Sequence, residues 1–154
     1  MASPVMSYLI CSMALVVLIV AMPFFFAMQR NTVAEEIAMR ELTEISDYTS
    51  NTLANLFFLA NSTNSANVNI TKQLLYLPLM VEGYFYTLEI SSDGTNALKV
   101  TSTLKDKPQI EGSSWLVPGL KVLNDEIIEI SGKSVVAGCY RNSTGFYIWI
   151  GEGE

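Results

Sequence analysis

The chain has 154 residues, half of them hydrophobic, and a formal net charge of −6, which favours one domain with a modest core. Because Lys and Arg are not clustered, this acidic balance argues against binding to nucleic acid and against electrostatic docking to anionic lipid. The sequence has no His and only two cysteines, Cys11 and Cys139. We expect these to be small buried residues rather than a disulfide or part of a zinc site.

The amino-terminal segment carries no charged side chain before Arg30. A helix needs about 20 apolar residues to cross a bilayer, so residues 4–28 are long enough. The run is too long for the apolar core of a cleaved signal peptide, which takes roughly 7–15 residues. We therefore predict a membrane-spanning or filament-core helix over residues 4–28. A plain signal-anchor remains open, but a helix that begins almost at the amino terminus favours a subunit that leaves the bilayer and packs against its copies.

Pro23 lies inside this segment and has two interpretations. Proline removes one helical hydrogen bond and clashes with the preceding turn, which kinks or locally melts a helix. Membrane helices tolerate proline, so the residue can be neutral. Alternatively, Pro23 is a built-in break that lets the helix extend when it leaves the membrane.

The helical pattern continues beyond Arg30. Small and apolar residues recur at steps of three or four, which is typical of an amphipathic helix. They are Ala34, Ala38, Leu42, Ile45, Thr49, Leu53, Leu56 and Ala60. No Gly or Pro interrupts residues 24–60, and the Asn, Ser and Thr cluster at 61–65 ends the pattern. We predict one continuous helix over residues 1–60, whose stripe packs against the domain that follows, and a polar loop over residues 61–72.

Residues 73–154 read as a β-rich extracytoplasmic domain. Short runs of β-branched and aromatic residues alternate with Gly, Pro, Asn and Ser turns, which indicates six or seven strands. The expected strands span residues 74–80, 84–90, 97–104, 115–122, 126–130, 133–141 and 146–150. The predicted fold class is α+β, with a long hydrophobic-to-amphipathic helix followed by a small antiparallel β domain, either a meander or a sandwich.

Catalytic parts are missing from the sequence, which has no His base, no glycine-rich phosphate loop and no nucleophile elbow. Asp125, Glu126 and Glu129 cluster, but Glu126 and Glu129 would point to opposite faces of a strand. We predict a protein that is not an enzyme and that has no cofactor and no metal.

Three N-x-T sequons begin at Asn61, Asn69 and Asn142 and are predicted glycosylation sites. We expect each asparagine in a loop, the first two within residues 61–72 and the third at the tip of the last hairpin. Two sequons in one loop and a third at a hairpin tip predict that the domain lies outside the cytoplasm.

The apolar helix from the amino terminus, Pro23, the amphipathic extension to residue 60 and the terminal antiparallel sheet together resemble the layout of type IV pilin-like surface filament subunits. The sequons, and the lack of a carboxy-terminal cysteine pair, make the chain more similar to archaeal members of this family than to bacterial ones. The resemblance implies a homo-oligomer that is inserted in the membrane before assembly and then forms a cell-surface filament, in contact with envelope or surface layers. Its core would be residues 5–26, and Pro23 matches the helix-breaking proline of many bacterial pilins. The core residues it implies are Val5, Leu9, Val16, Ile19, Phe24 and Phe26.

Two features depart from that family. Bacterial major pilins carry a glutamate at the fifth mature position, where this chain has Val5, and no basic-Gly leader precedes the apolar run. Two alternatives therefore stay open. One is a single-pass membrane-anchored accessory protein whose β domain binds an envelope layer or appendage machinery, and the other is a virion envelope protein.

Overall fold

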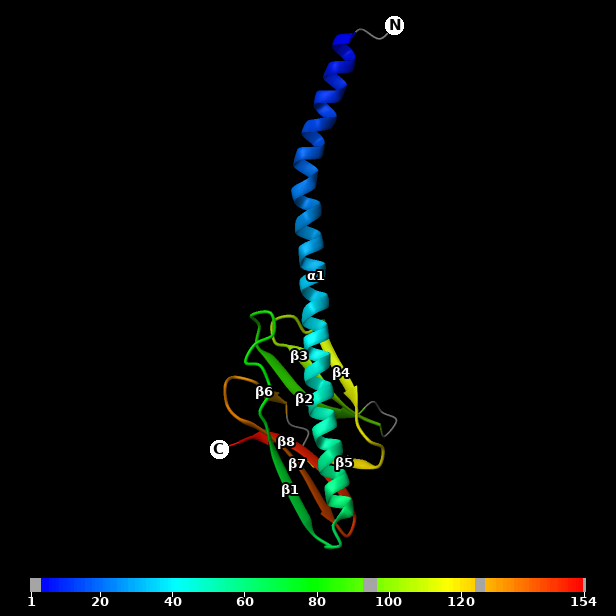
Figure 1. Ribbon diagram of the computed structural model, residues 1–154, viewed down its shortest axis with the longest axis vertical. Helices are drawn as coiled ribbons and strands as arrows, with labels where there is room; N and C mark the ends of the chain where they lie inside the picture. The colour runs from blue at the N-terminus through cyan, green and yellow to red at the C-terminus, as the bar shows by residue number, and fades with distance from the viewer. Residues whose placement is uncertain (1–3, 93–96, 124–126, 154) are drawn as a thin grey trace. The chain divides into compact units, whose positions relative to one another are not determined.

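The computed structural model describes residues 4–92, 97–123 and 127–153 and divides the chain into two parts, residues 1–36 and 37–154, which we treat separately (Figure 1). Within the described residues there is one helix, α1, and eight strands, so the predicted α+β class is confirmed. The helix and strands are α1 (Pro4–Ser62), β1 (Val68–Leu74), β2 (Tyr86–Ser92), β3 (Leu98–Leu104), β4 (Glu111–Trp115), β5 (Leu120–Val122), β6 (Ile128–Glu129), β7 (Val135–Asn142) and β8 (Gly145–Glu152).

The carboxy-terminal end of α1 is fixed by two hydroxyl groups. The Ser62 Oγ and the Thr63 Oγ1 each donate to the Leu59 carbonyl at 2.9 Å, which satisfies a carbonyl that the helix itself leaves unpaired. The helix therefore ends at Ser62, two residues later than the sequence predicts.

The described strands form two four-stranded sheets. One sheet has the order β1-β7-β8-β5 and the other β4-β3-β2-β6. Every pairing is antiparallel except that of β5 with β8, which is parallel. The architecture is therefore closer to two sheets around one core than to a single meander.

Two stretches differ from the predicted elements. Strand β1 takes in residues 68–72, where a polar loop was expected, while residues 75–80, expected to extend a strand, lie outside the strands. In β1, Val68 and Ile70 pack against the core and alternate with exposed Asn69 and Thr71. The polar residues between them hid this period-two pattern. Strand β4 was also missed, because Glu111–Trp115 is rich in Gly and Ser rather than in β-branched residues.

One hydrophobic core joins the second half of α1 to the inner faces of both sheets. The predicted stripe is buried from Ala38 onward, and Leu42 and Leu53 are fully buried, whereas Ala34 is exposed. Along the same helix, Phe57 meets Phe146 of β8 edge-to-face, with ring centroids 4.8 Å apart. The stripe thus faces the β domain, as the sequence predicts for residues 38–60.

Helix α1 approaches β3 and β4 through small polar residues. The hydroxyls of Ser46 and Ser102 lie 2.8 Å apart; Ser102 donates to the Leu42 carbonyl at 2.6 Å, and Ser46 is 3.0 Å from the Gly112 carbonyl. One turn further along, Ser50 donates to the Trp115 carbonyl at 2.8 Å. These bonds satisfy buried polar atoms and hold the helix backbone close to the sheet.

Replacing Ser46 by alanine is expected to lower the free energy of unfolding of the β domain by about 1–3 kcal/mol, because the buried Ser102 hydroxyl and Gly112 carbonyl lose a partner. The Ser46→Ala, Ser102→Ala double variant should cost less than the sum of the single variants, since the two hydroxyls bond each other. Urea unfolding followed by circular dichroism measures all three. Strictly additive losses would contradict a shared network.

Candidate assembly helix and modification sites

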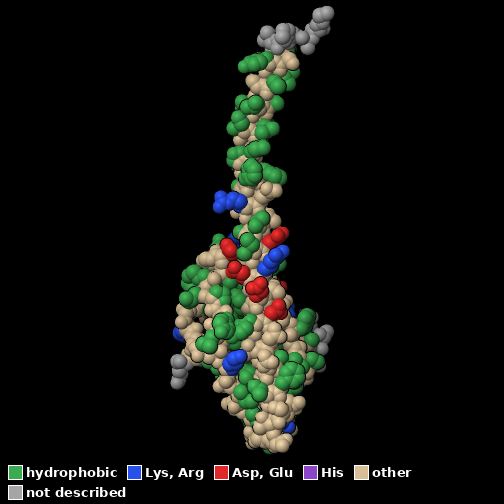
Figure 2. Space-filling model, in the orientation of Figure 1, with side chains coloured by type: hydrophobic (Ala, Val, Ile, Leu, Met, Phe, Trp, Pro, Cys, Tyr) green, Lys and Arg blue, Asp and Glu red, His purple; other side chains and the backbone are tan. Residues whose placement is uncertain are grey.

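The first part of α1 presents an apolar surface on every side. All residues from Met6 to Ile37 are exposed, and none before Arg30 is charged. Figure 2 shows hydrophobic side chains along the visible length of this segment, with backbone and other side chains between them. Five of the predicted core residues are more than half exposed, and the side chain of the sixth, Val5, lies outside the described residues. The five are Leu9, Val16, Ile19, Phe24 and Phe26.

Such a surface is unfavourable in water, at about 25 cal/mol for each Å² of apolar area. Within the described part of the chain, α1 is the helix that is long and apolar enough to cross a membrane. A helix of this kind is stable either in lipid or against other helices. These are the two environments that the sequence predicts for residues 4–28.

Pro23 lies inside α1, and the helix continues on both sides of it. Its ring nitrogen has no hydrogen to give to the Ile19 carbonyl, so this turn has one hydrogen bond fewer than its neighbours. A break at Pro23 on leaving the membrane stays a prediction.

The first two sequons do not begin in a loop, contrary to expectation, whereas the third lies at the tip of the last hairpin, as expected. Asn61 is in the last turn of α1, Asn69 is within β1, and Asn142 is the last residue of β7. Asn61 and Asn69 are exposed and Asn142 is half-buried. The helix runs two residues further than predicted, and β1 begins six residues before the expected strand at 74–80. Together they shorten the loop that was expected to hold the first two sequons.

The three sequons gather at the end of the β domain where α1 terminates. The Arg141 guanidinium donates to the Ala60 carbonyl at 3.2 Å and to the Thr63 carbonyl at 2.9 Å. Arg141 is also paired with Val68 across β7 and β1. Arg141 therefore links the helix end through its side chain and the start of β1 through its strand pairing.

Of the titratable groups that the structure describes, Tyr86 and Cys139 are buried in the core of the β domain. Tyr86 is fully buried and its hydroxyl donates to the Pro78 carbonyl at 2.8 Å. Burial raises the pKa of Tyr86 well above its ordinary value, and burial also raises the pKa of the Cys139 thiol. Both groups are therefore held in their neutral forms.

The β domain is expected to lose stability above about pH 10, where tyrosine ionises in an unfolded chain. The folded-state pKa of Tyr86 is raised, so its contribution is complete below that pH and falls as the pH rises. Tyr86→Phe should cost about 1 kcal/mol at pH 7, because the hydrogen bond to Pro78 is lost, and should flatten the alkaline decline. Thermal unfolding from pH 7 to 11 tests this. An equally steep decline in the variant would contradict it.

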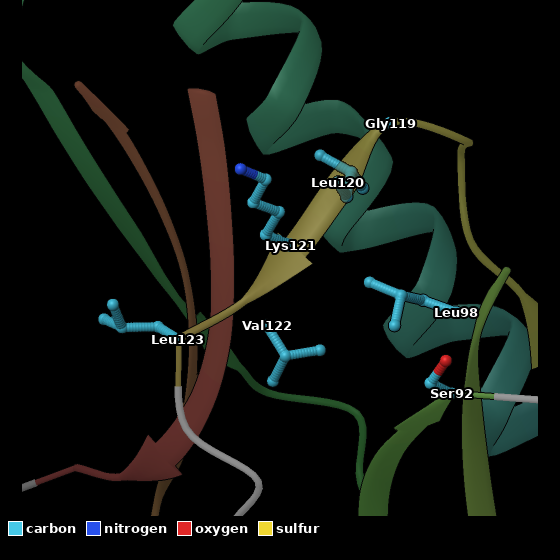
Figure 3. A pocket seen from close by; sticks show the side chains of 7 residues that line it. All are labelled: Ser92, Leu98, Gly119, Leu120, Lys121, Val122 and Leu123. Carbon is cyan, nitrogen blue, oxygen red and sulfur yellow. The ribbon is translucent and has the colours of Figure 1, made fainter. Parts of the chain in front are cut away.

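A shallow pocket of about 570 Å³ lies beside β5 (Figure 3). In Figure 3, Leu98 and Val122 lie on one side of the β5 strand, whereas Lys121 extends on the other, so the labelled polar groups do not converge on the space. Its lining residues are Ser92, Leu98, Gly119, Leu120, Lys121, Val122 and Leu123. Among the residues that the structure describes, no group of three or more Cys, Asp or Glu side chains is placed to hold a metal. Asp125 and Glu126 of the acidic cluster lie outside the described residues.

An exposed apolar loop follows β1 and was not singled out from the sequence. Leu75, Tyr76, Leu79 and Met80 are between 45 % and 80 % exposed. The Tyr76 ring touches Tyr48 of α1 edge-on, with centroids 5.9 Å apart. The sequence predicts a strand for these residues and gives no sign of their exposure. We call Leu75–Met80 the apolar loop.

Comparison of the chain with protein-family models, with curated proteins and with solved structures found no match. The architecture of the chain is pilin-like, with one long apolar amino-terminal helix followed by a β domain built from two sheets.

Proposed function

We propose that the protein is a structural subunit of a type IV pilus-like extracellular filament, which it builds by packing the apolar part of α1 against copies of itself. Before assembly, this segment lies in the membrane. In this proposal the protein works without catalysis and without a cofactor.

The observation that carries the proposal is the double use of a single helix. Residues 6–28 of α1 are uncharged and exposed, and residues 38–60 of the same helix supply its buried stripe to the core of the β domain. A simple anchor needs only the first property and can reach its domain through any linker. A subunit whose helices form the axis of a filament needs both, because the β domain must be fixed to the helix that polymerises.

The apolar loop supports a second candidate, a membrane-anchored accessory protein. Four large apolar side chains on the β domain form a surface that fits a protein partner better than water. In this alternative, α1 stays in the bilayer and the loop contacts an envelope layer or an appendage.

Removal of detergent distinguishes the two candidate functions. Full-length protein is extracted from membranes in a mild detergent, the detergent is removed, and the product is examined by electron microscopy and sedimentation. A filament subunit polymerises into helical fibres of constant width. A chain that only returns to lipid vesicles as single copies is an anchor, and this result would exclude the filament.

A further inference from the structure

The sheet β1-β7-β8-β5 brings two sequons together that are far apart in sequence. Asn69 of β1 is paired directly with Tyr140 of β7, and Asn142 follows Tyr140 by two residues on the same strand face. Residues opposite each other in an antiparallel pair share a face, and diagonal neighbours lie about 7–8 Å apart. Tyr140 is therefore flanked by the two asparagines.

These three residues lie on the outer face of the sheet. Their strand neighbours Val68, Ile70 and Cys139 pack in or against the core, so the alternating positions point away from it. Asn69 and Thr71, the first and third residues of one sequon, are both exposed. Since β1 is an edge strand of this sheet, Asn69 is open to an enzyme from the side as well as from above.

The same outer face carries a row of aromatic rings. Tyr140 is paired with Tyr147, and the next outward pair is Gly138 with Trp149. A Cβ atom on Gly138 would lie 2.6 Å from Cζ2 of Trp149, and one on Gly151 would lie 2.9 Å from its Cζ3. The indole thus lies flat on the strand backbone, in space that only glycine leaves free. We call Tyr140, Tyr147 and Trp149 the aromatic row.

The outer face of the other sheet has a different character. Its central outward positions on β2 and β3 are polar, and Glu89 is paired there with Thr101. Trp115 of the edge strand β4, paired with Lys99, is an exposed aromatic residue on that face, but the row of three rings belongs to the sheet that carries the two sequons. A sugar ring has an apolar C–H face that packs on an aromatic ring while its hydroxyl groups stay hydrated.

We propose that Asn69 carries an N-linked saccharide whose first sugar packs on the Tyr140 ring, so that this outer face is covered by glycan. The Asn69 side-chain nitrogen forms a bond to the anomeric carbon of a lipid-phosphate-linked oligosaccharide. The bond from that carbon to the phosphate oxygen breaks, the lipid phosphate leaves, and the amide proton passes to a base of the transferase. The inference rests on the extracytoplasmic position of the β domain in the proposed function, and not on polymerisation.

The geometry favours Asn69 over the other two sequons. The Asn142 Oδ1 accepts hydrogen bonds from the Thr144 backbone nitrogen at 2.8 Å and from the Thr144 hydroxyl at 2.6 Å, which fixes its carboxamide in a tight turn. Asn61 is in a helical turn, and the hydroxyl of its sequon, on Thr63, is donated to Leu59 instead. Asn69 is extended and exposed.

The test uses the full-length chain produced in cells with an N-glycosylation system and purified in detergent. Peptide mass mapping should show saccharide on the Asn69 peptide. Thr71→Ala removes the sequon but keeps Asn69, and it should lower the unfolding temperature by about 3 °C because the glycan contact is lost. With Tyr140→Thr already in place, Thr71→Ala should produce no such decrease.

The wild type, Thr71→Ala, Tyr140→Thr and the double variant are also made in cells without N-glycosylation. There, the change in unfolding temperature caused by Thr71→Ala reports the substitution alone, and it is subtracted as the baseline. Asn61→Gln removes a different sequon and is the matched control. Its effect on the unfolding temperature should be the same with Tyr140 and with Tyr140→Thr. An Asn69 peptide without saccharide, or an equal decrease with and without Tyr140, would overturn the inference. Filament formation is scored separately on the same wild-type preparation, so failure here is distinguishable from failure of the proposed function.

Discussion

Gly112→Ala is expected to lower the free energy of unfolding of the β domain by about 3 kcal/mol, the upper range for overpacking a core. A Cβ at this position would collide with the backbone nitrogen of Thr43 and the carbonyl carbon of Leu42, and would lie 2.7 Å from the Leu42 oxygen. These are backbone atoms of α1, so no side chain can rotate away. The helix would have to leave β4, which would break the hydrogen bonds that Ser46 and Ser102 make across the same contact.

The matched control is Ser113→Ala, one residue further along β4, where the side chain is exposed. Its effect should stay within about 0.5 kcal/mol. Urea unfolding of the two variants in the same detergent gives the comparison. If Gly112→Ala were as stable as the wild type, the close approach of α1 to β4 would be wrong.

The second large effect concerns assembly. The triple variant Leu9→Ala, Val16→Ala, Ile19→Ala keeps the segment apolar, so it should still insert in membranes. It removes side-chain volume from a helix that, in the proposal, packs against its copies. Since a loss of only 1.4 kcal/mol in association is already tenfold, we expect filament yield to fall by about tenfold or more.

The control removes an equal number of large apolar side chains from the apolar loop, as Leu75→Ala, Leu79→Ala, Met80→Ala. That chain should still form filaments, because its helix is intact. Membrane fractionation and sedimentation after detergent removal measure insertion and assembly separately. If the loop variant failed to assemble and the helix variant succeeded, the β domain rather than α1 would drive association.

The helix and its buried stripe were predictable because their signal is local and periodic. A long uncharged run followed by apolar residues at steps of three or four has few alternatives, and Leu42, Leu53 and Leu56 are all buried as predicted. The polar half of the same contact was not predictable. Ser46 and Ser50 look like surface residues until their partners on β3 and β4 are known.

The β domain shows the limit of local patterns more clearly. The last hairpin is predictable because its turn lies between two aromatic and β-branched runs. The sequence of β1 instead predicts a loop, because Asn, Thr, Lys and Gln dominate it. The strand forms because Val68 and Ile70 find the core and because β7 supplies its hydrogen bonds. Both causes are contacts with distant parts of the chain, which a local sequence pattern does not contain.

The sequons also have a local signal in the sequence but an arrangement that depends on the fold. The sequence identifies Asn61, Asn69 and Asn142, but it does not show that all three meet at one end of the domain. Strand register alone places Asn69 opposite Tyr140. No residue pattern within β1 or β7 predicts that pairing.

The most direct test of the central claim is a helical reconstruction, by electron cryomicroscopy, of the fibres that form when detergent is removed from the wild-type protein. The proposal predicts a fibre axis made of packed helices that belong to residues 6–28, with the β domains outside. A fibre held together by β domains alone, or single chains with α1 in lipid and no fibre, would contradict it.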